Sequence, residues 1–249
     1  MSDQNFINSN SNRITQILLE VQETAIAEVY ALQGNLSAEE FIRLIEGLNV
    51  KAIVTAKSAN AISIFTSSHA GMLESIEGFA VIAESTIQTL VNYNTQSLLS
   101  TLDNMAQIIK KEVVKGIISG VGTQSVVEAV RGQGALSATQ LKTLIDTAMN
   151  EYSRSVTKIM MDEMPDNTLY VYIGALDEKT RKVCLQQMKA GRRTLAEIPT
   201  LTSLGESVLT SGGGYNCRHK WEISVQDKFG HDPKKAKKMF DKLVREQSV

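Results

Sequence analysis

The sequence predicts a mainly α-helical protein that ends in a small α+β C-terminal domain. Apolar side chains recur at helical spacing from about residue 13 to residue 162, which is typical of amphipathic helices. After Pro165 the pattern changes to short β-branched and aromatic runs, beginning with LYVYI at 169–173, and these favour strands. The composition, with 43% apolar and 21% charged residues and a net charge of −1, indicates a globular chain rather than a disordered one.

The first segment, residues 1–114, is predicted to be a helical region. Its apolar stripes indicate four helices, which begin near residues 13, 37, 50 and 79. The second has the clearest start, because Ser37 is followed three positions later by Glu40, as a capping box requires. The third is expected to extend to about residue 69, and the fourth to run for many turns.

A helical lead-in is predicted for residues 115–164. Three glycines between residues 114 and 122 predict an interruption, because glycine is unfavourable inside a helix. A short helix is expected at 123–131. A long helix then begins after Ser137, which has Gln140 three positions on, and it ends before Pro165.

Residues 165–225 are predicted to form a sheet-and-helix module, followed by a basic helical tail at 226–249. The expected elements of the module are strands at 169–173, 194–198 and 219–225, a helix at 177–189 and a loop at 205–214. Three consecutive glycines in that loop favour a flexible hairpin tip over an approach to a ligand.

Basic side chains gather in the last quarter of the chain. Residues 179–249 contain 15 basic and 7 acidic side chains, whereas residues 1–178 contain 11 and 20. Such an asymmetry suits a polyanion or an acidic protein surface, and a solvated basic face is the alternative. With one Trp and no RNA-binding aromatic motif, the predicted contact is to phosphates, without base reading. The candidate residues are Arg192, Arg193, Arg218, Lys220, Lys234, Lys235, Lys237 and Lys238.

Cys184, Cys217 and His219 are the candidate metal ligands. A Cys-x-His spacing is less specific than paired Cys-x-x-Cys motifs, and a buried cysteine is commonly a small apolar side chain. If a metal binds, Asp177, His231 or water has to be the fourth ligand. A disulfide between the two cysteines is disfavoured in a reducing cytoplasm, although a particle that leaves the cell escapes that argument.

The motifs of several enzyme classes are absent from the sequence, which predicts a protein that is not an enzyme. There is no His-Glu-x-x-His, no Gly-x-Ser-x-Gly, no phosphate-binding Gly-x-x-x-x-Gly-Lys-Ser/Thr and no Gly-x-Gly-x-x-Gly. No run approaches the roughly 18 apolar residues of a membrane span, and the first twelve residues lack the apolar core of a signal peptide. The chain is therefore expected to be non-secreted and to contact no membrane.

The order of motifs in the second half is distinctive. A strand is followed by DEKTRKVC at 177–184, by MKAG at 188–191 and by YNCRH at 215–219. Over about residues 115–225 this order resembles the tailed-phage minor head proteins of the Mu protein F type. His219 stands where that family usually has cysteine, and SGGG at 211–214 replaces a proline-rich approach. The residues that match the family pattern are Asp177, Thr180, Arg181, Cys184, Gly191, Asn216, Cys217 and Arg218.

The resemblance implies a structural role in capsid morphogenesis. It implies a virion protein of the head, near the portal vertex, that occupies the host cytoplasm during assembly and acts in head assembly, DNA packaging or ejection. The implied partners are the portal protein, the major capsid or scaffolding protein and double-stranded DNA. Because histidine is also a zinc ligand, a zinc site of Cys184, Cys217 and His219 stays open. The alternatives are a metal-dependent hydrolase or toxin-like enzyme, and a helical adaptor without DNA contact.

Overall fold

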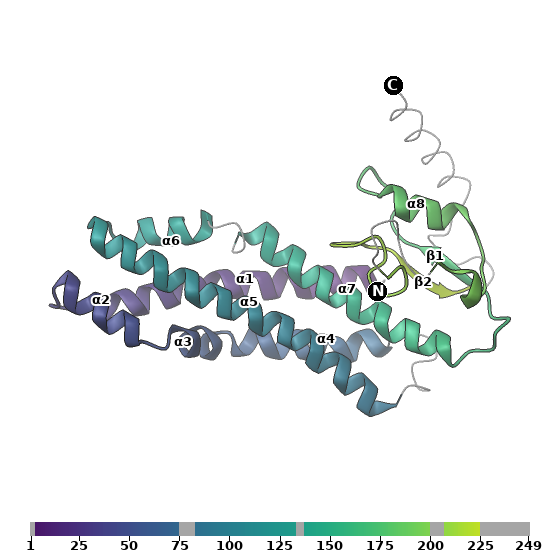
Figure 1. The fold of residues 1–249 in the computed structure, drawn as a ribbon, viewed down its shortest axis with the longest axis horizontal. Helices are drawn as coiled ribbons and strands as arrows, with labels where there is room; N and C mark the ends of the chain where they lie inside the picture. The colour runs from purple at the N-terminus through teal and green to yellow at the C-terminus, as the bar shows by residue number, and fades with distance from the viewer. Residues whose placement is uncertain (1–2, 75–82, 133–136, 200–206, 225–249) are drawn as a thin grey trace, which may run out of the picture. The chain divides into compact units, whose positions relative to one another are not determined.

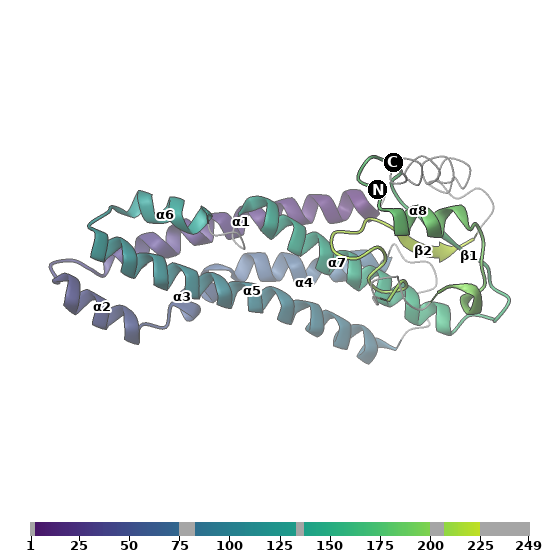
Figure 2. The ribbon, with the colours of Figure 1, turned by 45° about the horizontal axis from the view of Figure 1, so that its top comes forward.

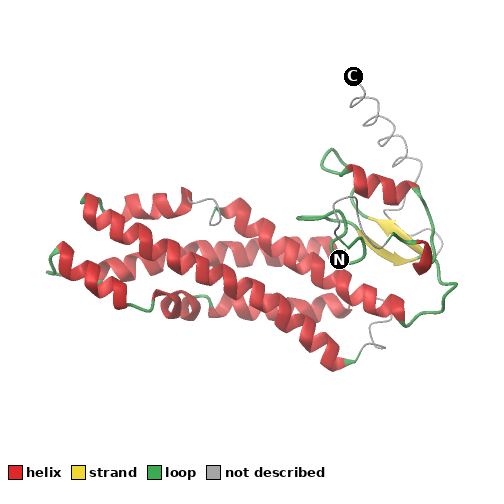
Figure 3. Ribbon diagram, viewed as in Figure 1, coloured by secondary structure: helices red, strands yellow, loops and turns green. Residues whose placement is uncertain are grey.

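The computed structural model describes residues 3–74, 83–132, 137–199 and 207–224. This part of the chain contains eight α-helices and a two-stranded sheet (Figure 3), so the predicted mainly α fold with a small α+β part is confirmed. None of the described helices combines the length and the apolar character needed to cross a bilayer. The helices are α1 (Asp3–Ala31), α2 (Ala38–Gly47), α3 (Val50–Lys57), α4 (Ala59–Glu74), α5 (Glu84–Ser119), α6 (Thr123–Gly132), α7 (Ala138–Asp162) and α8 (Lys182–Lys189), and the strands are β1 (Tyr170–Ile173) and β2 (Lys220–Ile223).

The chain divides into two compact units. The helical unit comprises residues 1–70 and 91–148, and the C-terminal unit comprises residues 71–90 and 149–249. The boundary expected near residue 114 falls inside α5, which is continuous from Glu84 to Ser119. The predicted basic tail lies outside the described residues.

The helical unit packs α1 against α3 and α6 (Figures 1 and 2). Apolar side chains three, four or seven positions apart line one face of each long helix, so a continuous core forms between them. Burial of each such side chain is worth about 1.5–3 kcal/mol relative to exposure. In α1 the core positions include Ile14, Leu18, Val21 and Ala25, and in α5 they include Leu98, Leu102, Met105 and Ile109.

The helix starts follow the capping residues. The Ser37 hydroxyl accepts the backbone N–H of Glu40 at 3.3 Å, and a Glu40 carboxylate oxygen accepts the N–H of Ser37 at 2.9 Å, which confirms the predicted capping box. Asn49 caps α3 in a similar way, accepting from Ala52 N–H at 3.0 Å. The single helix expected over residues 50–69 is wrong. Ser58 has ψ near 1°, outside helical angles, and separates α3 from α4, a change that apolar spacing does not signal.

The interruption expected between residues 114 and 122 is confirmed at residues 120–122, but it does not include Gly116, because α5 passes through that residue and ends at Ser119. Gly120, with φ of +65°, follows the helix in the left-handed conformation typical of a glycine at a helix end. Gly116 has a packing role instead. A Cβ there would lie 2.4 Å from Val126 Cγ2 and 2.6 Å from the Tyr30 hydroxyl oxygen, so glycine allows α1, α5 and α6 to approach closely.

We expect Gly116→Ala to destabilise the protein by about 1–3 kcal/mol, because the added methyl group overpacks this contact. The Tyr30 hydroxyl, which donates to the Val121 carbonyl at 2.9 Å, would also have to move. Gly47→Ala is the matched control, since no atom lies within 4 Å of its added Cβ. Urea unfolding of both variants measures the difference, and equal midpoints would contradict the packing role.

The C-terminal unit is built on β1 and β2, which pair antiparallel with Tyr172 opposite Trp221 and Tyr170 opposite Ile223. Both strands were predicted, and their positions are confirmed to within two residues. The aromatic rings form the core of this unit, with Tyr172 and Trp221 centroids 5.1 Å apart. Helix α8 packs against β1 (Figure 1).

Two predicted elements of the C-terminal unit are wrong. Residues 194–198 form no strand, because Thr194 and Glu197 make a capping box around a 3₁₀ turn at Leu195–Glu197. The helix expected at 177–189 begins only at Lys182. Before it, the Thr180 hydroxyl accepts the N–H of Asp177 at 2.9 Å and donates to the Ala175 carbonyl at 2.8 Å, so the side chain holds a turn in place of a helix.

Candidate metal centre

Three predicted ligands meet in the core of the C-terminal unit. Cys184 projects from the first turn of α8, and Cys217 and His219 lie just before β2. The two Sγ atoms are 3.6 Å apart, and Cys217 Sγ is 3.8 Å from His219 Nδ1. All three ligand atoms lie within 4.8 Å of one another, and the residues are only 1%, 3% and 3% exposed.

The separation of the two sulfurs fits one tetrahedral ion. With zinc–sulfur bonds of 2.3 Å, tetrahedral geometry places two sulfurs about 3.8 Å apart, close to the distance seen here. A disulfide needs a sulfur–sulfur distance of about 2.05 Å, and both cysteines are free thiols. Within the described part of the chain, this is the one group of His, Cys, Asp or Glu side chains placed to share an ion.

The imidazole of His219 is oriented as a metal ligand. Its Nε2 lies 2.8 Å from the Ala175 carbonyl oxygen, which can only accept, so Nε2 bears a proton and Nδ1 is the nitrogen that faces the sulfur and would bind the metal. The ring also stacks on Tyr172, with centroids 5.7 Å apart. Gly174 makes room for it, because a Cβ there would lie 2.4 Å from His219 Cδ2.

Two of the three consecutive glycines, Gly212 and Gly213, lie against the two sulfurs. The N–H of Gly213 donates to Cys217 Sγ at 3.1 Å, and a Cβ on Gly213 would lie 2.4 Å from Cys184 Sγ. Gly212 has φ of +60°, and a Cβ added to it would lie 3.1 Å from Cys217 Sγ. All three glycines are buried, so the interpretation as a flexible hairpin tip is wrong: the glycines let the backbone contact the ligand sulfurs.

Two arginines hold the backbone around the site. Arg154 of α7 is 2% exposed; its Nε donates to the Thr210 carbonyl at 2.6 Å and its Nη1 to the Cys217 carbonyl at 3.0 Å. The same Nη1 lies 3.4 Å from the His219 carbonyl oxygen. Arg181 donates to the carbonyls of Gly213, at 2.8 Å, and Tyr215. Sequence reasoning did not assign Arg154 a role, because a single arginine among several charged side chains of this amphipathic helix gives no signal of its own.

The two thiols differ in acidity. The hydrogen bond with Cys184, together with His219 and the Arg154 guanidinium, lowers the pKa of Cys217. The same contact with Cys217, together with burial, raises the pKa of Cys184. Cys217 is therefore the sulfur that ionises first, and a thiolate is the form that binds metal.

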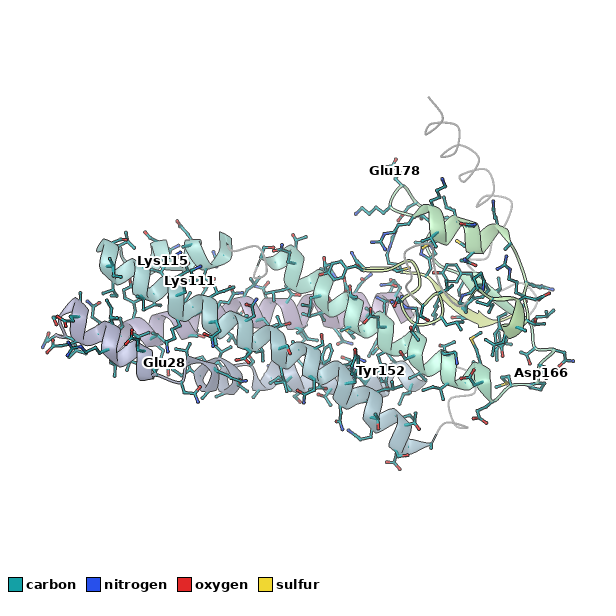
Figure 4. The ribbon with its side chains drawn as sticks, in the orientation of Figure 1. Glu28, Lys111, Lys115, Tyr152, Asp166 and Glu178 are labelled. Atoms are coloured by element: carbon teal, nitrogen blue, oxygen red, sulfur yellow. The ribbon has the colours of Figure 1, made fainter. Side chains whose placement is uncertain are left out.

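Asp177, one of the three candidates for a fourth ligand, is paired with Arg218 instead. Its two carboxylate oxygens accept from Arg218 at 2.6 and 2.7 Å, and one also accepts the N–H of Lys179 at 3.0 Å. The hydrogen bond from Arg218 is the main reason that the pKa of Asp177 falls to about 2. The neighbouring Glu178 is exposed and points away from the unit (Figure 4). His231, another candidate, lies outside the described residues.

The Asp177 pair is expected to make stability depend on acid pH. Because the folded-state pKa of Asp177 is lowered from 3.8 to about 2, its contribution is complete above about pH 4 and is lost as the pH falls towards 2. The contribution is modest, since the carboxylate is 43% exposed. Asp177→Asn should lower the melting temperature at pH 6 and remove this dependence, measured in chelator so that metal loss does not interfere. Parallel pH profiles for both proteins would contradict the assignment.

The candidate DNA-contacting residues differ in their surroundings. Arg192 is exposed, whereas Lys220 forms an ion pair with Glu222 at 2.9 Å and Arg218 is held by Asp177. Arg193 lies 3.4 Å from the Gln187 side-chain oxygen, and its backbone pairs with that of Tyr170. The other four candidates, Lys234, Lys235, Lys237 and Lys238, lie outside the described residues.

Comparisons with known proteins identify no relative: no family model, no curated protein and no solved structure matches this sequence. A helical fold with a small sheet is shared by proteins of many functions, so function has to be argued from the site.

Proposed function

We propose that this protein is a structural minor head protein of a tailed bacteriophage whose C-terminal unit is organised by a zinc ion. The observation that carries the zinc part of the proposal is the convergence of Cys184, Cys217 and His219, all buried, with ligand atoms within 4.8 Å of one another. Cys184 lies 33 residues before Cys217, so a shared ion would fasten α8 to the segment that leads into β2.

The donor atoms select zinc. Two thiolates and one imidazole are soft or borderline ligands, which magnesium and calcium avoid and zinc accepts in tetrahedral geometry. The second shell is also suited to a metal. His219 Nε2 is held by a carbonyl, and a backbone N–H points at the Cys217 sulfur.

The residues that resemble the minor head family support a structural role, because they build the surroundings of this centre. Asp177, Thr180 and Arg218 hold the turn before α8, and Arg181 holds the loop of glycines. Gly191 and Asn216 supply the left-handed backbone angles, φ of +75° and +57°. A motif whose members position a loop and its ligands is consistent with a binding or assembly module.

The proposed partners are those of a head protein: the portal protein, the major capsid or scaffolding protein, and double-stranded DNA. Contact with DNA is supported by the charge asymmetry of the chain, and its affinity should fall steeply with salt and ignore sequence. A metal-dependent hydrolase is the second candidate. Three candidate protein ligands lie together within the described residues, and catalytic zinc sites also have three protein ligands.

Three measurements test the proposal: metal analysis, the protein content of phage particles, and binding to a DNA duplex at low salt. Metal analysis of protein purified without chelator should give about one zinc per chain, and purified phage particles should contain the chain next to the portal. Protein that is metal-free and gains no zinc on incubation would remove the zinc centre. Particles that lack the chain would contradict the assignment as a head protein. A DNA duplex that stays unbound at low salt would contradict DNA as a partner.

A further inference from the structure

A small pocket, partly open to solvent, lies over the candidate metal centre. Its volume is about 90 Å³, and it belongs entirely to the C-terminal unit. The three metal ligands form part of its wall, and its other lining residues are Lys179, Arg181, Asn216 and Arg218. The ligands are therefore reachable from solvent through this pocket, although each is almost completely buried as a residue.

Tetrahedral geometry gives the pocket a defined relation to the ion. Three protein ligands occupy three corners, and the fourth corner faces away from the plane that contains them. The inner side is taken by the Tyr172 hydroxyl, 3.9 Å from Cys184 Sγ and 3.8 Å from Cys217 Sγ, and Tyr172 does not line the pocket. The side that accommodates an added ligand is therefore the pocket.

The charge of the pocket selects an anion. Two thiolates and a neutral imidazole would balance the two positive charges of a zinc ion, which would leave the centre neutral. Around it stand Lys179, Arg181 and Arg218, with Asp177 pairing only Arg218. The surplus of positive charge near a metal favours an anionic ligand over a neutral one.

Its size restricts the ligand further. Drug-sized molecules occupy pockets of roughly 300–1,000 Å³, whereas 90 Å³ corresponds to the volume of about three water molecules. The enclosed space favours a small ligand, such as a tetrahedral oxyanion, over a drug-sized one.

We propose that this pocket binds a phosphate-type oxyanion, one oxygen of which takes the fourth position on the metal while Lys179 and Arg181 neutralise its charge. The proposal rests on the metal binding proposed above. The same chemistry is offered by free phosphate and by the backbone of DNA, and the test separates these sources.

The test uses the full chain loaded with one Co²⁺, which takes zinc geometry and is visible by its absorption. Free metal is removed by gel filtration, and inorganic phosphate is then added at constant ionic strength. We expect a saturable change in the Co²⁺ visible spectrum, with broadening of the ³¹P signal of phosphate by the nearby paramagnetic ion. Lys179→Gln should weaken phosphate binding about tenfold, because one charge-assisted contact is lost.

Lys182→Gln is the matched control, since Lys182 is exposed, lies three residues away and does not line the pocket. A Co²⁺ spectrum that phosphate leaves unchanged, or an equal loss of affinity in both variants, overturns the oxyanion site while leaving the metal centre in place. A protein that takes up no Co²⁺ refutes the metal centre itself, which is a distinct result. Displacement of phosphate by a short DNA duplex identifies the DNA backbone as the source, and binding of phosphate without competition by the duplex identifies the free ion.

Discussion

Cys217→Ser is expected to reduce zinc affinity by more than about 100-fold, because loss of a second-shell partner already costs 10- to 100-fold and this change removes a ligand. Cys217 is the more acidic of the two thiols, and it is also the sulfur that receives the Gly213 N–H. At a zinc concentration a thousand times its dissociation constant, bound metal stabilises the wild-type fold by about 4 kcal/mol. The variant should lose most of that stabilisation, measured as a lower melting temperature in zinc.

Chelator separates loss of metal from loss of fold. In excess EDTA the wild type and Cys217→Ser should melt at similar temperatures, because neither then holds an ion. Tyr172→Phe is the control for the site, since it removes the hydroxyl near both sulfurs but no proposed ligand, and it should retain zinc. A wild-type melting temperature that responds to neither zinc nor EDTA would make the three residues an ordinary part of the core.

The helices that sequence patterns predicted best are those with a local start signal. The Ser37 capping box is contained in four consecutive residues, so its geometry depends on nothing elsewhere in the chain. Gly116 was wrongly predicted to interrupt the helix. A side chain there would collide with Val126 and Tyr30, and these residues approach it only after folding. The strand expected at 194–198 failed for the opposite reason, since a local capping interaction at Thr194 overrides the apolar pattern.

The group of candidate metal ligands was predictable because the chain has two cysteines and three histidines, so few combinations exist. Their supporting contacts were not predictable. Arg154 contacts backbone carbonyls 56 to 65 residues away. Every residue has a backbone carbonyl, so the sequence does not indicate which of them this side chain contacts. The glycines at 212–214 likewise predicted a turn, and only the folded chain shows that Gly212 and Gly213 lie against sulfur.

Arg154→Met is expected to destabilise the C-terminal unit by about 3 kcal/mol. The guanidinium is almost fully buried and donates to the carbonyls of Thr210 and Cys217, so its removal leaves buried acceptors without a donor. Each hydrogen bond to a charged group contributes about 1.5–3 kcal/mol, and part of this sum is offset because no charge has to be buried in the variant. Methionine keeps an unbranched side chain, so the change tests the hydrogen bonds more than the packing. Chemical denaturation in EDTA measures this loss of unfolding free energy without any contribution from metal.

Arg154 also positions the proposed ligands, because it donates to the backbone carbonyl of Cys217 and lies near the backbone carbonyl of His219. Arg154→Met should therefore weaken zinc binding by about 10- to 100-fold, as expected for a second-shell partner. Arg192→Met is the matched control in the same unit: its side chain is exposed, and the change should stay within about 0.5 kcal/mol and leave zinc affinity unaltered. Arg154→Lys retains the charge but lacks the planar fork that spans several carbonyls, so it should recover only part of both losses. An Arg154→Met protein with wild-type stability and wild-type zinc affinity would show that the loop holds its ligands in place without this side chain.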